Sequence, residues 1–235
     1  TFLGLSVEDA DAAACAEAVW HLRPVLSGEL EKNGMERLYR EIEFPLCRVL
    51  YRMENRGICI DREQLRQFGD MLSRRISDCE TLIFSYSGGE FNINSTRQLG
   101  ELLFEKLGLP PVKKTKTGYS TSAEVLEQLK DYAIVENILA YRQLAKLKST
   151  YVEGLLNLAD ENDAIHTSFN QTITATGRLS STEPNLQNIP VKTEEGRRIR
   201  EAFIAKKKGN LLLACDYSQI ELRVLAHVSG DEVLK

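Results

Sequence analysis

Apolar residues recur at every third or fourth position through most of the first 160 residues, a spacing that predicts amphipathic helices. Between residues 35 and 55, for example, Leu38, Ile42 and Leu46 fall on one face. The pattern predicts six helical segments, over residues 10–25, 35–55, 62–85, 96–107, 122–129 and 134–158.

Local signals mark where several of these helices begin and end. Pro45 predicts a kink or a helix start, because its ring removes a helical hydrogen bond. Asp61 predicts an N-cap for the helix that follows it. Gly88 and Gly108 predict the ends of the helices that precede them. Two pairs have the spacing of a capping box: Ser95 with Gln98, and Thr121 with Glu124.

The pattern changes after about residue 160. Residues 165–176 alternate and are rich in β-branched side chains, which predicts a strand. Residues 180–190 are rich in Ser, Asn and Pro and predict a loop. Leu211–Asp216 predicts a second, buried strand, and an amphipathic helix follows it at once. The sequence therefore predicts an α+β protein that is predominantly helical, with a small antiparallel sheet in its last third.

The charge distribution is uneven along the chain. The net charge is −4, yet residues 106–150 and residues 178–208 each hold eight basic against four acidic residues. Such local stretches can attract phosphate groups even in an acidic protein. They can equally be ordinary solvated faces, and charge alone leaves both interpretations open.

Composition narrows the class of protein further. The longest apolar run, Leu211–Cys215, is far shorter than the roughly 20 residues of a membrane-spanning helix. No basic-then-apolar leader opens the chain, so we expect neither secretion nor a membrane partner. The cysteines are scattered without a CxxC pair, which argues against a disulfide framework or zinc site and fits a reducing cytoplasm. They are Cys15, Cys47, Cys59, Cys79 and Cys215.

Two acidic residues near the end of the chain are candidates for chemistry. Asp216 closes an apolar run and precedes a helix, a position that can present a carboxylate to Mg²⁺. Asp also commonly caps turns and helices, so the residue alone identifies no activity. Glu221 has capping-box spacing from Ser218, which offers it a structural role as well.

A polar segment precedes these carboxylates. Arg178 and the amides Asn185, Gln187 and Asn188 lie within a short stretch bounded by proline. These side chains can bond base edges, sugars or phosphates. Asn and Ser are also common turn residues, so composition favours neither interpretation.

These segments together resemble one family. The motif DYSQIELR at residues 216–223 is similar to motif A of the family A DNA polymerases, the bacterial DNA polymerase I type. Nearly all of residues 40–235 share in the resemblance, in the family's order. The other matching segments are FNINS (91–95), YRQLAKLKSTY (141–151), TGRLSS (176–181), PNLQNIP (184–190) and EGRRIR (195–200).

The resemblance implies three parts. Residues 1–40 resemble the end of a 3′–5′ exonuclease-like domain, residues 41–160 a helical thumb, and residues 161–235 the first part of a palm. The fingers and the rest of the palm are expected beyond residue 235. The chain starts at Thr1 and ends within a helix and turn, so we interpret it as a piece of a longer protein.

The resemblance also implies roles for motif A. Asp216 would ligate two catalytic Mg²⁺ ions, with the carbonyl of Tyr217 as a further ligand, in nucleotidyl transfer to a primer 3′ end. Glu221 would exclude ribonucleotides by crowding the 2′-hydroxyl, beside Ser218 and Gln219 at the nucleotide. The implied partners are primer–template DNA and deoxynucleoside triphosphates, bound by a monomer in the bacterial cytoplasm at the nucleoid.

The resemblance assigns the DNA contacts to two groups. Arg178, Asn185, Gln187 and Asn188 would follow the minor groove, where hydrogen-bond acceptors occur in every base pair. A second group would hold the DNA backbone: Asn92, Asn94, Ser95, Lys113, Lys114, Lys116 and Lys192.

Two positions depart from the family's pattern. Leu5 stands where the exonuclease motif has Tyr, although Asp9 matches its Asp, so we expect no proofreading. Lys192 stands where the family usually has Arg, which weakens bidentate phosphate binding there. Three hypotheses follow for the chain: part of a DNA polymerase, a DNA clamp without chemistry of its own, or an inert folded piece. We expect the chain alone to be inactive, because the second metal-binding Asp and the fingers are absent from it.

Overall fold

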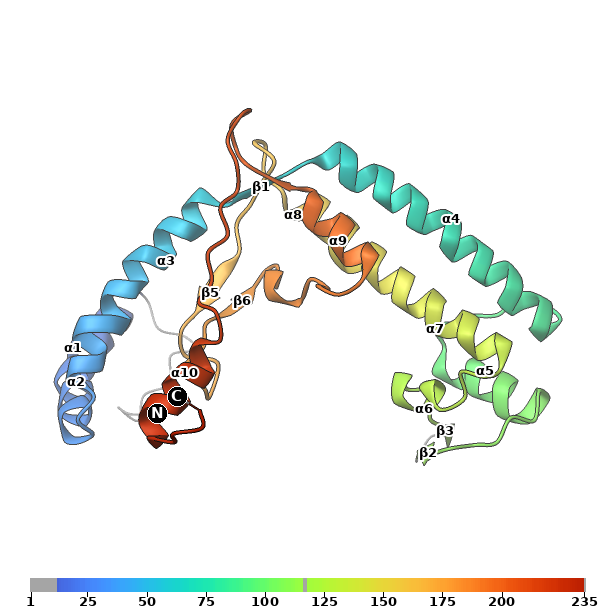
Figure 1. Ribbon diagram of the computed structural model, residues 1–235, viewed down its shortest axis with the longest axis horizontal. Helices are drawn as coiled ribbons and strands as arrows, with labels where there is room; N and C mark the ends of the chain where they lie inside the picture. Colours follow the sequence, from blue (N-terminus) through green and yellow to red (C-terminus); the bar gives the residue numbers. More distant parts are fainter. Residues whose placement is uncertain (1–11, 116–117, 235) are drawn as a thin grey trace.

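The computed structural model describes residues 12–115 and 118–234. The chain forms an arch with two long helical sides (Figure 1). One side holds α1 (Ala12–Lys32), α2 (Glu36–Leu38) and α3 (Phe44–Arg56), and the other is built around α4 (Arg62–Ser87) and α7 (Ala133–Lys146). The predicted fold class is confirmed: the protein is predominantly helical, with small antiparallel sheets.

The remaining elements are short. The helical ones are α5 (Thr96–Gly100), α6 (Ala123–Glu127), α8 (Gly154–Leu158), α9 (Glu194–Glu201), α10 (Ile220–Ser229), the π-helical segments η1 (Tyr39–Glu43), η2 (Glu101–Lys106) and η3 (Leu147–Glu153), and the 3₁₀ turn η4 (Leu186–Asn188). The strands are β1 (Ile58–Ile60), β2 (Lys114–Thr115), β3 (Gly118–Tyr119), β4 (Ala164–Ile165), β5 (Ser168–Asn170), β6 (Ser180–Thr182) and β7 (Phe203–Ile204). All the pairings are antiparallel: β4–β1–β7, β2–β3 and β5–β6.

Several predicted helix boundaries are confirmed. Asp61 caps α4 by accepting a hydrogen bond from the Gln64 amide at 2.9 Å. Gly88, in the left-handed region at φ +74°, ends the same helix. Pro45 lies in the first turn of α3, directly after the π-helical segment η1, so the helix geometry changes next to this proline.

One predicted boundary is wrong. Thr121 does not cap the next helix, because Ser122 holds the N-cap position of α6. The Thr121 side chain is instead buried, with 4% of its surface exposed, and its hydroxyl accepts a hydrogen bond from Arg142 at 3.4 Å. The helix begins one residue later than the spacing predicts, and Arg142 binds the Thr121 carbonyl and hydroxyl oxygens instead.

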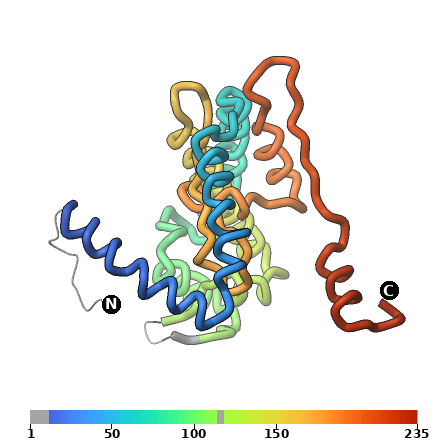
Figure 2. The backbone as a smooth tube through the Cα atoms, turned by 90° about the vertical axis from the view of Figure 1, so that its left-hand side faces the viewer, coloured from blue at the N-terminus to red at the C-terminus, as the bar shows by residue number. Residues whose placement is uncertain are grey.

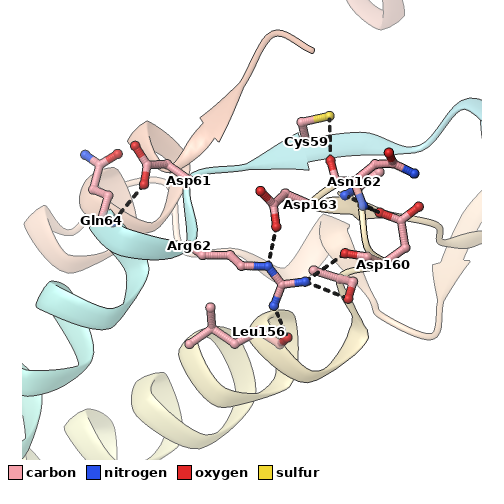
Figure 3. A network of polar contacts seen from close by, with 10 residues as sticks. Cys59, Asp61, Arg62, Gln64, Leu156, Asp160, Asn162 and Asp163 are labelled. Carbon is pink, nitrogen blue, oxygen red and sulfur yellow. Dashed lines mark hydrogen bonds and ion pairs between the residues drawn. The ribbon is translucent and has the colours of Figure 1, made fainter.

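We call the top of the arch, where β1 and the start of α4 meet the end of α8, its crown. Arg62 holds these elements together (Figure 3). Arg62 donates to the carbonyl oxygens of Leu156, Ala159 and Asp160 at 2.8–3.0 Å and also pairs with Asp163. It thereby satisfies the carbonyls left free at the end of α8. Gly57, just before β1, has φ +61°, and a Cβ there would lie 2.8 Å from the Ile165 carbonyl oxygen, so the crossing requires glycine.

The core lies along the α4–α7 side. Apolar side chains from α4, α5, η2, α6 and α7 form one cluster, in which Leu103, Leu126 and Ile138 are fully buried. A second cluster, around Leu72, joins α4 to η3, α8 and α9 near the crown. Each fully buried Leu or Ile contributes about 1.5–3 kcal/mol to folding.

The last third departs most from the predictions. The predicted strand over 165–176 is two short strands, β4 and β5, and residues 171–176 form no strand. Part of the predicted loop 180–190 is a strand, since β6 pairs with β5 through Ser168–Thr182, Phe169–Ser181 and Asn170–Ser180. Local composition predicts a loop here, so the pairing partner decides the structure of this segment.

The predicted buried strand at Leu211–Asp216 is also wrong. This segment has no regular structure, and Leu211 and Leu213 are 91% and 88% exposed. No strand within the described residues pairs with it. In Figure 2 the segment runs down one side of the molecule, apart from the helical body, to α10.

Candidate active site and nucleic-acid interface

The motif A carboxylate lies on this extended segment. Asp216 is exposed, and Tyr217 beside it is 78% exposed. Among the described residues, no three His, Cys, Asp or Glu side chains gather as a metal site. Asp216 and the Tyr217 carbonyl therefore offer oxygen donors of the kind that Mg²⁺ prefers, but only a partial set.

Helix α10 begins at Ile220, shortly after Asp216. Its N-cap is Gln219, in the left-handed region at φ 52°, and not Ser218. The predicted capping box from Ser218 to Glu221 is therefore wrong. The Ser218 carbonyl instead accepts a hydrogen bond from the Arg223 Nε at 2.9 Å.

Glu221 pairs with the loop that the sequence linked to DNA. The Arg178 guanidinium donates to the Glu221 carboxylate, across 43 residues of sequence. Both side chains are more than 70% exposed, so the pair contributes little to stability in water. Its importance is positional, because it brings a candidate minor-groove residue to the candidate sugar-selecting residue.

The amide-rich loop is firmly held. Asn185 Oδ1 accepts from the Gln187 amide at 3.0 Å and caps the 3₁₀ turn η4. Gln187 Nε2 donates to the Leu179 carbonyl at 3.1 Å. At the other end Tyr151 donates to the Asn188 carbonyl, and burial raises the pKa of Tyr151, which keeps that hydroxyl protonated. The side chains of Asn185, Gln187 and Asn188 all remain exposed.

The Asn92–Ser95 segment leads into α5, at the foot of the arch opposite α10 (Figure 1). Ser95 accepts a hydrogen bond from the Gln98 amide at 3.4 Å, as predicted. Gln98 Oε1 accepts a hydrogen bond from the Asn92 amide at 2.9 Å. In a complete capping box the Gln98 side chain would bind the Ser95 amide instead. Asn94 Nδ2 donates to the Tyr141 hydroxyl at 3.2 Å and ties this turn to α7.

A groove of about 1110 Å³ opens beside this turn. Most of the residues that line this groove were not among those predicted from sequence. Arg142 donates to the Thr121 carbonyl oxygen there, and burial lowers its pKa from the ordinary arginine value. The lining includes Asn94, Arg97, Ser120, Ser122 and Arg142. The three hydroxyl residues at 120–122, shortly after the lysine-rich loop, were the feature of the sequence that could have indicated this groove.

The lysines of the second group are dispersed. Lys113 is exposed, and Lys114 begins the β2–β3 hairpin near the groove. Lys116 lies outside the described residues. Lys192 lies elsewhere, in a second groove of about 730 Å³ between α4 and α9, together with Gln64, Arg197 and Arg198.

The candidate residues thus fall into separate regions. Asp216, Glu221 and Arg178 lie along the C-terminal segment and the loop beside it. The Asn92–Ser95 turn lies at the opposite foot of the arch (Figure 1). Within the described parts of the chain, none of the helices combines the length and apolar character needed to cross a bilayer.

Comparison with known proteins identifies the family of the chain. Residues 62–235 match the model of DNA polymerase family A. The chain belongs to this family, and it is of the bacterial DNA polymerase I type.

Individual relatives agree with this assignment. The chain is 54% identical over 221 residues to DNA polymerase I of Bacillus subtilis and 53% identical over 221 residues to that of Geobacillus stearothermophilus. These alignments cover 93% of the chain but only 25% of either relative. The chain thus spans about a quarter of the length of the curated relatives it matches.

A solved structure extends the similarity to the fold. The structure described as the POL domain of Pol1 from M. smegmatis in complex with DNA primer–template and dNTP superposes with a TM-score of 0.81 at 44% identity. The match covers 93% of this chain and 39% of that one.

Proposed function

We propose that this chain is part of a DNA-directed DNA polymerase that extends a primer on a template in replication or repair. Residues 41–160 would form its thumb, residues 161–235 the first part of its palm, and residues 1–40 the end of an exonuclease-like domain. The observation that carries the proposal is the contact between Arg178 and Glu221, which joins the segment between β5 and β6 to the helix that follows Asp216.

Asp216 would supply the catalytic carboxylate. Its carboxylate and the Tyr217 carbonyl are exposed oxygen donors on adjacent residues, and they fit one side of a Mg²⁺ site. Two such ions, when bound, stabilise the charge on the attacking and leaving oxygens. The chain's own contribution is to present the donors from a backbone that α10 and Arg223 anchor.

Glu221 would act on nucleotide choice. It lies in the first turn of α10, five residues after Asp216, so a nucleotide held at Asp216 would lie near it. A carboxylate there rejects an added 2′-hydroxyl by crowding and desolvation. Ser218 and Gln219 shape the turn between the two acids, and Arg178 holds the Glu221 carboxylate.

The DNA partner would be held at two places. Asn185, Gln187 and Asn188 are exposed amides on a fixed loop, suited to the acceptors of the minor groove. Asn92, Asn94, Ser95 and the lysine loop would bind the backbone without sequence preference. We further propose that the complete protein is a monomer in the bacterial cytoplasm, associated with the nucleoid.

Primer extension tests the proposal. The longer protein that contains this chain should add deoxynucleotides to a primer with Mg²⁺, and the product sequence should follow the template. Four templates that differ in the first unpaired base, each offered all four nucleotides singly, give this readout. Extension that ignores the template base, or no extension, would contradict the proposal.

The alternative is a DNA-binding piece without chemistry. The partial donor set at Asp216 favours it for residues 1–235 taken alone. We expect those residues to incorporate no nucleotide at any Mg²⁺ concentration. Template-dependent extension by the purified chain, free of host polymerase, would contradict that expectation.

A further inference from the structure

Two buried hydroxyls lie beneath the amide-rich loop. Thr167 and Ser181 are 6% and 1% exposed, and in the described part of the chain Thr121 is the other polar residue buried to this degree. The two hydroxyl oxygens lie 2.7 Å apart. They come from the segment between β4 and β5 and from β6, so the pair also joins neighbouring strands.

The hydroxyl pair satisfies the loop's backbone. Thr167 Oγ1 lies 3.0 Å from the Thr182 carbonyl oxygen and 2.8 Å from that of Pro184. Ser181 Oγ lies 3.1 Å from the Pro184 carbonyl oxygen and accepts the Leu186 amide at 3.2 Å. Two hydroxyl hydrogens and one backbone N–H thus bind two carbonyls and a hydroxyl oxygen, and the two hydroxyl residues themselves are buried.

These contacts fix the turn from which the candidate DNA contacts extend. Pro184 and Leu186 flank Asn185, and Leu186 begins the 3₁₀ turn that holds Gln187 and Asn188. A carbonyl that loses the hydroxyl donor must find another partner, and reaching one requires the backbone of the 184–186 segment to shift. Removing a hydroxyl therefore displaces the exposed amides above it.

We propose that Thr167 and Ser181 are positioning residues for primer–template binding: they hold the 184–188 backbone so that Asn185, Gln187 and Asn188 meet the minor groove together. The inference rests on the proposed function. In this proposal the positions of the three amides depend on two hydroxyls that do not themselves contact DNA, as in a preorganised site.

Matched substitutions at Thr167 test the inference in the complete polymerase. Thr167→Val keeps the shape and removes the hydroxyl, whereas Thr167→Ser keeps the hydroxyl. We expect Thr167→Val to lower kcat/KM for primer–template about tenfold, the size expected for the loss of one hydrogen bond. KM for the nucleotide should stay within about twofold, and Thr167→Ser should restore most of the loss.

A double-mutant cycle separates positioning from general destabilisation. If Thr167 acts through the amides, Thr167→Val should cost little more once Gln187→Ala and Asn188→Ala are present. The control Ile199→Val removes a methyl from a fully buried side chain on α9 and should lower Tm without this coupling. The same tenfold loss in both backgrounds, or an equal loss in Thr167→Ser, would overturn the inference.

A readout without DNA keeps the test independent of activity. Hydrogen exchange at the Leu186 amide should speed up in Thr167→Val and in Ser181→Ala but not in Ile199→Val. Unchanged exchange in both hydroxyl variants would overturn the inference while leaving the polymerase proposal intact. A wild-type protein that does not extend primers would overturn both.

Discussion

The helical side at residues 62–158 and the C-terminal segment at residues 205–234 use apolar residues in opposite ways. In the first, Leu103, Leu126 and Ile138 are fully buried among helices that lie close in sequence. In the second, Leu211 and Leu213 are almost fully exposed, and Ala226 is the buried apolar residue of the described α10. A helix makes its own backbone hydrogen bonds, whereas a strand needs a neighbour. An apolar run therefore specifies a buried strand only where the fold supplies that neighbour.

The largest expected effect is on stability. Leu103→Ala should lower the free energy of unfolding by about 2–5 kcal/mol, because it opens a cavity in the α4–α7 core. Leu213→Ala, the same change at an exposed site, should stay within about 0.5 kcal/mol. Urea unfolding of residues 1–235, followed by circular dichroism, measures both. Equal losses would show that the two regions do not differ as described.

The second effect is on sugar selection by the C-terminal segment. In the complete polymerase, Glu221→Ala should raise ribonucleotide incorporation relative to deoxyribonucleotide by at least about tenfold, or roughly 1.4 kcal/mol. It should also cost some rate with deoxynucleotides, because Arg178 loses its partner. Arg178→Ala serves as the comparison, since it breaks the ion pair but keeps the carboxylate. Unchanged discrimination in Glu221→Ala would remove this role from Glu221.

A third prediction concerns DNA binding at the helical foot. Residues 1–235 should bind duplex DNA weakly, with a log–log salt slope of roughly −3 to −4 for three or four phosphate contacts. Replacing Lys113, Lys114 and Lys116 by Ala should flatten that slope. The triple variant of Lys206, Lys207 and Lys208 removes the same charge elsewhere and should change it less. If residues 1–235 bind no duplex DNA even at about 20 mM salt, the DNA-clamp hypothesis is wrong for the isolated chain, and the hypothesis of an inert folded piece stands.

The smallest effect is a pH dependence at the crown. Hydrogen bonds from the Ala164 amide, and from the Asn162 amide and His166, lower the pKa of Asp160 to about 2. An unfolded Asp titrates near 3.9, so this stabilisation is present above about pH 4 and is lost as the pH falls toward 2. Asp160→Asn, which keeps an acceptor oxygen, should flatten acid unfolding in that range. Identical acid curves for the two proteins would contradict the assignment.

Sequence patterns predicted the features that local sequence decides and missed those that burial or a distant partner decides. Asp61, Gly88 and Ser95 act on backbone groups within a few residues, so local sequence revealed them. Thr121 and β6 were mispredicted because burial and a strand partner decide them. The Arg178–Glu221 pair spans 43 residues, and no local pattern predicts it. The specific roles of the candidate residues came from family resemblance, and the hydroxyl pair beneath the loop became visible only in the structure.

The central claim, that Asp216 is a catalytic carboxylate, is tested by one substitution in the complete polymerase. Asp216→Ala should abolish primer extension while primer–template affinity stays within a few-fold, because the carboxylate acts on the transition state more than on bound DNA. Asp231→Ala, at an exposed acid just past α10, is the control and should extend normally. If Asp216→Ala kept more than about a tenth of the wild-type rate, a barrier change below roughly 1.4 kcal/mol, the claim would be wrong.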